Sequence, residues 1–301
     1  MFDIKRISAF LSFTKKVISL KRKNRDSLIF FALSGLGDVC YCLSVAKALK
    51  NQGGKKMVLF TNEYLYPLVR CYSFIDEVNV LSAEDIDLIK KASEEFSNVF
   101  VYNKLSKITG VFVCNPLTED MYENLSKNSG ESNYIEILQK YVFSKPELLA
   151  YPVIEKSELN ELDFNCHEKT VIINPFSNSL SLKDESVYSE IIGLLKSKGY
   201  TVYTNIINNQ KPLCGTLELR CNLIELYNLS KRVKLFVSIR SGILDFCIGS
   251  GGKFLVLYNG DIWQGNFKKA YSLTGWKTDS AVFEFDCCQK EKIIEAINKI
   301  C

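Results

Sequence analysis

Histidine is almost missing from this sequence, which has only His167 among 301 residues. Ser-His-Asp catalysis and histidine-rich zinc sites both depend on that residue type, so neither chemistry has the material it needs. The eleven cysteines form no C-x-x-C pair, and no signal peptide with a cleavage site precedes them. We expect reduced cytosolic thiols packed in protein cores, with no disulfide framework, no bound metal and no cofactor.

Long hydrophobic runs are also absent. The apolar runs at residues 28–33 and 234–239 fall far short of the roughly 20 residues that a bilayer-spanning helix needs. The chain is nevertheless 47% hydrophobic. It is long enough for two cores, because a single core stops growing at roughly 250 to 300 residues. The composition therefore predicts a soluble, cytoplasmic protein of two domains.

Positive charge is concentrated in the first 25 residues. This segment carries eight basic side chains against one acidic side chain, so the remainder of a chain with net charge +4 is acidic. On a helical period its apolar residues share one arc: Ile4, Ile7, Phe10, Leu11, Val17 and Ile18. Two interpretations stay open: a helix on the anionic inner face of a membrane, or a helix packed on its own protein with a solvated basic face. The acidic body does not favour nucleic-acid binding.

From residue 27 onward, short β-rich runs alternate with helical stretches. Strands are predicted at residues 28–33, 56–61, 76–81, 98–103, 110–115, 170–176, 200–206, 234–239, 253–258 and 281–286. Helices are predicted at residues 38–53, 83–95, 133–143, 184–199, 222–232 and 289–300, with a short one after 241. Such alternation builds parallel sheets covered on both faces. The sequence therefore predicts an α/β fold of two tandem Rossmann-like, doubly wound domains that face a central cleft.

The alternation pauses between about residues 144 and 168, where two prolines and many charges indicate a connector. We divide the chain into an N-terminal helix (1–26), a first Rossmann-like domain (27–150), a linker (151–168), a second Rossmann-like domain (169–285) and a closing helix (286–301). The closing helix is expected either to stay with the second domain or to cross back to the first.

A glycine-containing turn follows the first predicted strand. The stretch SGLGDV places Gly35 and Gly37 between strand and helix, with Asp38 beside them. Glycine permits a positive φ or a close approach of the backbone to a ligand, and the first amides of a helix favour an anion. The turn is not a G-x-G-x-x-G motif, because Cys40 takes the third glycine position. Two roles are open to Asp38: a capping or first-turn aspartate, or a general base for an incoming hydroxyl.

The same segment resembles the opening of the heptosyltransferase-type glycosyltransferases of family nine. In that family a strand leads to a G-x-G-D-V turn and a helix ending in A-L-K, as residues 28–50 do here. Residues 170–203 are similar to the family's strand, H-P-G-S, lysine, helix, glycine and strand segment. Asn174–Ser177 stand in place of H-P-G-S, and Lys183 in place of the lysine. Residues 222–261 resemble the stretch that selects the donor nucleotide sugar.

This resemblance implies the GT-B architecture, in which two Rossmann-like domains share the substrates. It implies that residues from about 27 to 150 bind the acceptor and that residues from about 169 to 285 bind a nucleotide diphosphate sugar. It also implies that Asp38 is the general base of an inverting transfer.

One stretch departs from the family pattern. Where the family commonly shows D-[ST]-G-x-x-H, this chain reads Arg240, Ser241, Gly242, Ile243, Leu244 and Asp245. An arginine replaces an acid and an acid replaces a histidine, which points to a divergent member with a donor other than heptose. Arg240 suits the leaving diphosphate, and the amides of Ser241 and Gly242 open a short helix and also suit phosphate. The alternative for Arg240 and Asp245 is a structural salt bridge.

Three further side chains are candidates for the donor site. Lys183 precedes a predicted helix, and Ser177 follows a strand end, where each suits phosphate or ribose. Glu225 falls where an acid would bind ribose. Each has a structural alternative: a solvated lysine, a turn-forming serine and an exposed helix glutamate. The turn-rich block 258–267 is as compatible with a lid as with a surface loop.

These features predict a metal-independent, inverting glycosyltransferase of hexosyl or heptosyl type, acting on a glycan or lipid-linked acceptor in cell-surface polysaccharide synthesis. Two rivals stay open. One is a catalytically silent GT-B-like protein that binds a partner glycosyltransferase. The other is a nucleotide-sugar epimerase or hydrolase on the same fold, which would convert the donor without an acceptor.

Overall fold

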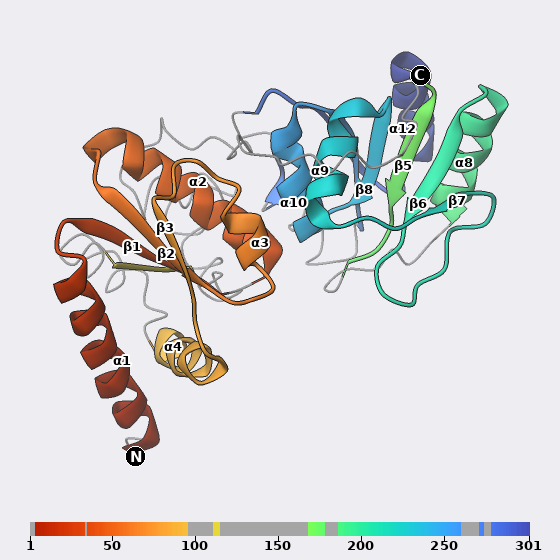
Figure 1. Cartoon of the computed structure of the whole chain (residues 1–301). Helices are drawn as coiled ribbons and strands as arrows, with labels where there is room; N and C mark the ends of the chain where they lie inside the picture. The colour runs from red at the N-terminus through yellow and green to blue at the C-terminus, as the bar shows by residue number, and fades with distance from the viewer. Residues whose placement is uncertain are drawn as a thin grey trace, which may run out of the picture. The chain divides into compact units, whose positions relative to one another are not determined.

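The structure is a computed structural model, and it describes residues 4–33, 35–95, 111–114, 168–177, 186–259, 271–273 and 278–301. The chain divides into two compact units, Met1–Lys156 and Ser157–Cys301, each with its own parallel sheet (Figure 1). The division falls inside the connector predicted at 151–168. The predicted bounds of the domains and of the linker stay predictions.

The first unit has a four-stranded sheet in the order β3-β2-β1-β4. Its strands are β1 (Ser27–Ala32), β2 (Lys56–Thr61), β3 (Glu77–Val80) and β4 (Val111–Cys114). Its helices are α1 (Ile4–Lys23), α2 (Leu36–Gly53), α3 (Tyr66–Val69) and α4 (Ala83–Glu95). All strand pairs are parallel, and Phe30 at the centre of β1 lies opposite Leu59 of β2 and Phe112 of β4.

Alternate residues of β1 face two helical layers. Ile29, Phe31 and Leu33 belong to a core that includes Ile89 of α4 and the partly buried Leu20 of α1. The other face of the sheet is covered by α2 (Figure 1). An ion pair between Lys16 of α1 and Asp85 of α4 adds to this packing. The described part of α1 is therefore a helix packed on its own unit, while its membrane contact stays a prediction.

The second unit has a six-stranded parallel sheet in the order β10-β9-β8-β5-β6-β7. Its strands are β5 (Thr170–Asn174), β6 (Thr201–Asn205), β7 (Leu217–Leu219), β8 (Leu235–Ile239), β9 (Lys253–Tyr258) and β10 (Ala281–Asp286). Its helices are α8 (Ser186–Ser197), α9 (Leu223–Arg232), α10 (Gly242–Cys247) and α12 (Lys290–Ile300), with a 3-10 turn, η2 (Ile248–Ser250).

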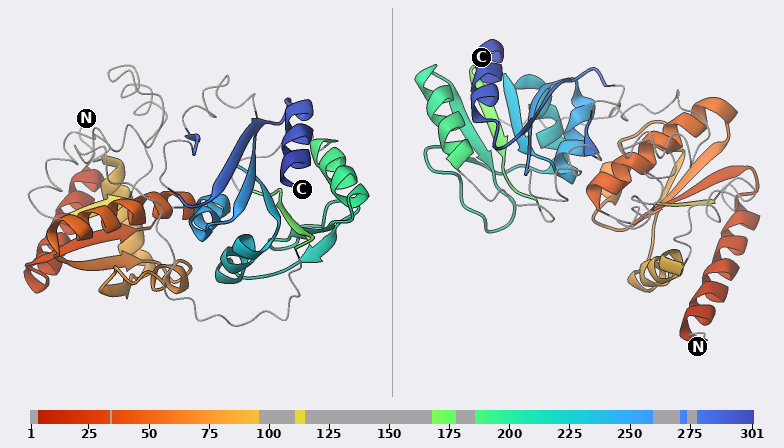
Figure 2. Two further views of the ribbon diagram at one scale, coloured as in Figure 1. Left: turned by 90° about the horizontal axis from the view of Figure 1, so that it is seen from above. Right: turned by 180° about the vertical axis from the view of Figure 1, so that it is seen from behind.

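Two pairs of helices sandwich this sheet. The pair α8 and α12 covers one face, and the pair α9 and α10 covers the other (Figure 2). Ile293 and Ile297 of α12 are fully buried in the core that α8 forms with the strands. Lys290 at the start of α12 also contacts Glu190 of α8 at 2.8 Å. These contacts anchor the closing helix to the second unit, and a crossing to the first unit stays a prediction.

Most predicted elements that fall on described residues are confirmed, within a few residues at each end. The one-turn helix α3 and the short edge strand β7 were not predicted. Helix α2 begins at Leu36, two residues earlier than predicted. The strand predicted at 98–103 and the helix predicted at 133–143 lie outside the described residues.

The described side chains include eight cysteines, and all are free thiols: Cys40, Cys71, Cys214, Cys221, Cys247, Cys287, Cys288 and Cys301. Within the described ranges, no helix combines the length and apolar character that crossing a bilayer requires.

Candidate functional site

Among the described strands, the direction of strand addition reverses once in each sheet. In the second unit the chain runs from β5 to β6 and β7, then returns to place β8 on the other side of β5. In the first unit β1 lies between β2 and β4 for the same reason. Open α/β sheets bind ligands outside the carboxyl ends of strands at such switch points. The candidate site residues therefore lie in the segments that follow β5 and β8 in the second unit and β1 in the first unit.

A bridge of buried polar side chains lies at the switch point of the second sheet. Asn174, the last residue of β5, donates through Nδ2 to Ser238 Oγ at 3.0 Å and to Ser241 Oγ at 3.5 Å. Its Oδ1 accepts a hydrogen bond from Asn205 of β6 at 2.9 Å. Buried polar groups are costly unless they are hydrogen-bonded, so this network fixes the carboxyl ends of β6, β5 and β8 relative to one another.

Arg240 directly follows β8 and forms a buried ion pair. Its Nη1 lies 2.7 Å from Asp245 Oδ1, and the two residues are only 3% and 4% exposed. Its Nε donates to Tyr271 O at 3.0 Å, and Nη1 donates to Ser241 O at 3.3 Å. The structure thus shows the salt bridge that the sequence left open as the alternative. Direct contact of Arg240 or Asp245 with a donor stays a prediction.

Ser241 and Gly242 form the start of α10. Ser241 is the N-cap residue, and its Oγ accepts a hydrogen bond from Leu244 N at 3.3 Å. Gly242 is the first helical residue and is partly exposed. Ser177 is also partly exposed and lies three residues after the end of β5. The segments carrying these residues follow adjacent strands, whereas Lys183 lies outside the described residues.

Glu225 belongs to a capping box at the start of α9. Its carboxylate accepts a hydrogen bond from Asn222 N at 2.7 Å. In return, Asn222 Oδ1 accepts from Ile224 N and Glu225 N, both at 3.0 Å. This reciprocal pattern satisfies amides that have no partner within the helix. The structure therefore shows a helix-capping role for Glu225, and its binding of ribose stays a prediction.

The glycine turn of the first unit differs in detail from the expectation. Gly35 is the N-cap of α2 with φ −62° and ψ 162°, so it does not use the positive φ that glycine permits. Gly37 is the second residue of the helix, and Asp38 is the third. Asp38 is therefore a first-turn residue and not the N-cap, because the helix begins earlier than predicted. Its backbone lies just past the carboxyl end of β1, while its side chain lies outside the described part of the structure.

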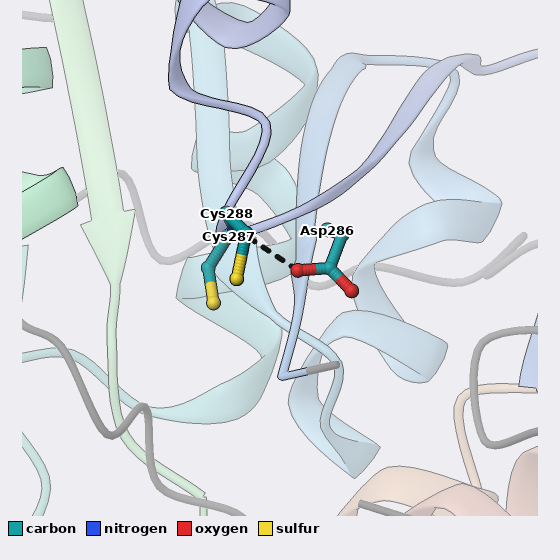
Figure 3. Close-up of side chains that lie close together, drawn as sticks. All are labelled: Asp286, Cys287 and Cys288. Carbon is teal, nitrogen blue, oxygen red and sulfur yellow. Dashed lines mark hydrogen bonds between the residues drawn. The ribbon is translucent and has the colours of Figure 1, made fainter. Parts of the chain in front are cut away.

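Among the residues that the structure describes, one group of side chains that could ligate a metal lies at the end of β10 (Figure 3). The ligand atoms of Asp286, Cys287 and Cys288 lie within 4.8 Å of one another. Cys288 N donates to Asp286 Oδ1 at 3.0 Å, and hydrogen bonding to this carboxylate raises the pKa of the Cys288 thiol to about 11. Among the described residues these three side chains are one short of the four ligands that a structural zinc site takes, so we assign no metal to this turn.

Buried thiols in the second unit are similarly unreactive. Desolvation raises the pKa of Cys221 to about 12 and also raises the pKa of the fully buried Cys247. The nucleophilic form of cysteine is the thiolate, so neither residue is activated for covalent catalysis.

Sequence reasoning did not select Asn174, Asn205 or Ser238 as site residues. The signal was present, because β5 and β6 read TVIIN and TVYTN, and each strand ends on an asparagine, which is buried in the structure. A polar residue at the carboxyl end of a buried parallel strand lies where the sheet meets its ligand edge.

Comparison with known proteins gives structural matches. The chain is similar to a glycosyl transferase of family 9 from Veillonella parvula, with TM-score 0.55 and 13% identity over 92% of this chain and 90% of that one. It is similar to the ADP-heptose LPS heptosyltransferase II of E. coli, with TM-score 0.59 and 12% identity over 91% and 98%. E. coli heptosyltransferase WaaC with ADP gives TM-score 0.50 and 13% identity over 91% and 99%.

No protein-family model and no curated protein matches the sequence. At sequence identities of 12–13%, the structural similarity shows a shared fold. It confirms the α/β fold of GT-B type, and the resemblance to glycosyltransferase family nine holds at that level.

Proposed function

We propose that the protein is a metal-independent, inverting glycosyltransferase. It moves a hexosyl or heptosyl group from a nucleotide diphosphate sugar to a glycan or lipid-linked acceptor in cell-surface polysaccharide synthesis. The observation that carries this proposal is the switch point of the second sheet. There the segments after β5 and β8 lie side by side on a buried polar bridge, in a fold shared with heptosyltransferases.

The donor would bind at this edge of the second unit. Amides at Ser241 and Gly242 begin α10 and suit the diphosphate, while Ser177 and Lys183 supply hydrogen bonds to phosphate or ribose. The buried Arg240–Asp245 pair links the end of β8 to α10. Because this turn is also where the sequence departs from the family pattern, we assign donor selection to it.

The acceptor would bind to the first unit, with Asp38 as general base. Asp38 takes the proton of the acceptor hydroxyl as its oxygen bonds to the anomeric carbon. The bond between that carbon and the nucleotide diphosphate breaks on the opposite face, so the configuration inverts. The displaced diphosphate leaves with its negative charge stabilised by the donor-site amides and lysine.

A thermal-shift screen of UDP, GDP, ADP and CDP tests the donor half of this proposal. A nucleotide at a hundred times its Kd stabilises the folded chain by about 2.7 kcal/mol, so one nucleotide should raise the melting temperature above the others. Lys183→Ala should reduce that shift, whereas Lys211→Ala, at an exposed lysine of the same unit, should preserve it. A melting temperature that no nucleotide changes would contradict donor binding.

One observation favours the silent binding protein as the second candidate. Arg240, the side chain best suited to a diphosphate, is buried and paired with Asp245. A silent protein would give no transfer from any nucleotide sugar and would tolerate Asp38→Asn. The epimerase or hydrolase would instead release product with no acceptor present, which chromatography of the donor alone would reveal.

We also propose that α1 contacts an anionic membrane surface. Lys15, Arg22, Lys23 and Arg25 are exposed, as is the apolar Ile18. In co-sedimentation with phosphatidylserine vesicles, K15E/R22E should remain in solution at a salt concentration at which the wild type sediments. A control pair at exposed lysines of the second unit, K211E/K253E, should sediment as the wild type does. Equal recovery of all three proteins would reject this contact.

A further inference from the structure

Residues Tyr271–Leu273, here called the strap, are held by side chains from three adjacent strands. From the end of β8, Arg240 Nε donates to Tyr271 O at 3.0 Å. From the end of β9, Tyr258 Oη lies 3.2 Å from the same carbonyl oxygen. Side chains at the carboxyl ends of two neighbouring strands therefore lie against one backbone carbonyl of the strap.

The third strand contributes Glu284 of β10. Its carboxylate accepts a hydrogen bond from Ser272 Oγ at 2.8 Å and from Leu273 N at 2.9 Å. It also accepts a hydrogen bond from the Tyr258 hydroxyl. The Glu284 carboxylate thus accepts hydrogen bonds from two donors of the strap and from one donor of the sheet.

Burial makes this arrangement specific. Tyr258 is 1% exposed and Leu273 is 3% exposed. Desolvation raises the pKa of Tyr258 well above its usual value, so its hydroxyl stays protonated and keeps its role as donor. A buried amide or hydroxyl that loses its acceptor is costly. Buried hydrogen bonds to Glu284 and Tyr258 therefore hold the strap in position.

The strap is continuous with the proposed donor edge. Arg240 joins Tyr271 O on one side to Ser241 O and Asp245 on the other. Ser241 Oγ in turn accepts from Asn174 at the switch point. Polar contacts thus run from β10, through the strap and Arg240, to the turn that begins α10.

We propose that Glu284 and Tyr258 are positioning residues for the binding of a nucleotide diphosphate, an inference that rests on the proposed function. They hold the strap against Arg240, and Arg240 fixes the β8–α10 turn whose amides receive the diphosphate. Neither side chain contacts the reacting atoms. Sites of this kind lose affinity when the supporting contacts of a ligand-binding group are loosened, even by about 1 Å.

The test uses the full chain with Glu284→Gln and Tyr258→Phe. A glutamine has one acceptor oxygen where the carboxylate has two, so one donor of the strap loses its partner. Because the single oxygen of glutamine can still accept from Leu273 N, exchange is measured in Glu284→Ala, where amide hydrogen exchange at Leu273 should accelerate at least ten-fold, with the amides of α12 unchanged. The Kd of the nucleotide that stabilises the wild type should rise about ten-fold, the lower end of what outer-shell partners contribute at metal sites. Glu291→Gln, at an exposed glutamate of α12, should change neither quantity.

The kinetic constants KM and kcat distinguish a positioning residue from a catalytic residue. The KM for the donor should rise in both variants while kcat stays within about three-fold, because the general base is untouched. Tyr258→Phe removes only a hydroxyl and keeps the ring, so it serves if Glu284→Gln does not fold.

Unchanged exchange at Leu273 would overturn the strap, and faster exchange with an unchanged Kd would overturn its positioning role. A wild-type chain that binds no nucleotide would overturn the proposed function and the positioning role together. Hydrogen exchange would still report whether Glu284 holds the strap.

Discussion

At the scale of single residues, burial decides what Arg240 and Asp245 do. Asp245→Asn would leave a guanidinium that is 3% exposed without its counter-charge. Breaking such a pair costs about 3–5 kcal/mol, far more than the loss of a surface ion pair. We expect the free energy of unfolding to fall by that amount in a urea titration followed by circular dichroism.

Two controls sharpen this prediction. Asp279→Asn, at an exposed carboxylate of the same unit, should change the free energy of unfolding by less than about 0.5 kcal/mol. Replacing both partners, R240M/D245L, should recover much of the stability, because apolar side chains leave no buried charge uncompensated. If Asp245→Asn is no less stable than R240M/D245L, the ion pair is not what stabilises this turn.

Asp76 should make the stability of the first unit depend on pH. Partial burial alone would raise the pKa of Asp76, but hydrogen bonds from Lys50 and from Met57 N, the latter at 2.6 Å, lower it overall. A lowered folded-state pKa means that the folded chain binds fewer protons than the unfolded chain. This contribution to stability is therefore complete above the unfolded pKa, near 4, and is lost as the pH falls through the folded pKa.

Asp76→Asn should accordingly flatten the fall of stability between pH 5 and pH 2.5. The urea midpoint of the variant should lie below that of the wild type at pH 7 and approach it at the acid end. Glu63→Gln, at an exposed glutamate of the same unit, should retain the wild-type slope. Parallel curves for wild type and Asp76→Asn would show that this carboxylate does not couple folding to protons.

At the scale of elements, strands were predictable because buried parallel strands read as continuous apolar runs. Strands β2 and β9, which are buried over five of their six residues, begin and end at the predicted residues. The partly exposed edge strand β10 also has its predicted bounds, although Glu284 interrupts its apolar run. The three-residue β7 has no such run, and its Leu217 is 54% exposed. The start of α2 was misplaced because a glycine inside the first turn reads as a turn residue, although Gly37 is helical here.

Helix α9 offers a test that separates capping from ligand binding. Asn222→Ala removes the side chain that accepts from two amides and should lower stability by about 0.5–2 kcal/mol in urea. Glu225→Ala should lower it by less, since Asn222 keeps its own bonds. If Glu225 only caps the helix, both variants bind the nucleotide as the wild type does. A weaker nucleotide affinity in Glu225→Ala alone would instead assign ribose binding to this carboxylate.

At the scale of the whole molecule, the sequence predicted the two-unit fold but not the state of the site. The order of strands and helices determines where each switch point lies, so the segments after β1, β5 and β8 were predictable. The Arg240–Asp245 salt bridge was one of two alternatives that the sequence left open. The hydrogen bond from Arg240 to Tyr271 O was not predictable, because Tyr271 is thirty-one residues away and reaches Arg240 only through the folded sheet. Side-chain pairing at this distance depends on tertiary packing that no local pattern contains.

Asp38→Asn tests the division of labour between the two units. If the first unit supplies the base and the second unit binds the donor, this variant should keep the nucleotide-induced thermal shift. It should lose about 10²–10⁴-fold in kcat, the usual contribution of a general base. The asparagine amide cannot take up the proton that a carboxylate accepts. Asp87→Asn, at an exposed aspartate of α4, should retain the wild-type kcat. Full turnover in Asp38→Asn would show that Asp38 is not the general base and has only a structural role in α2.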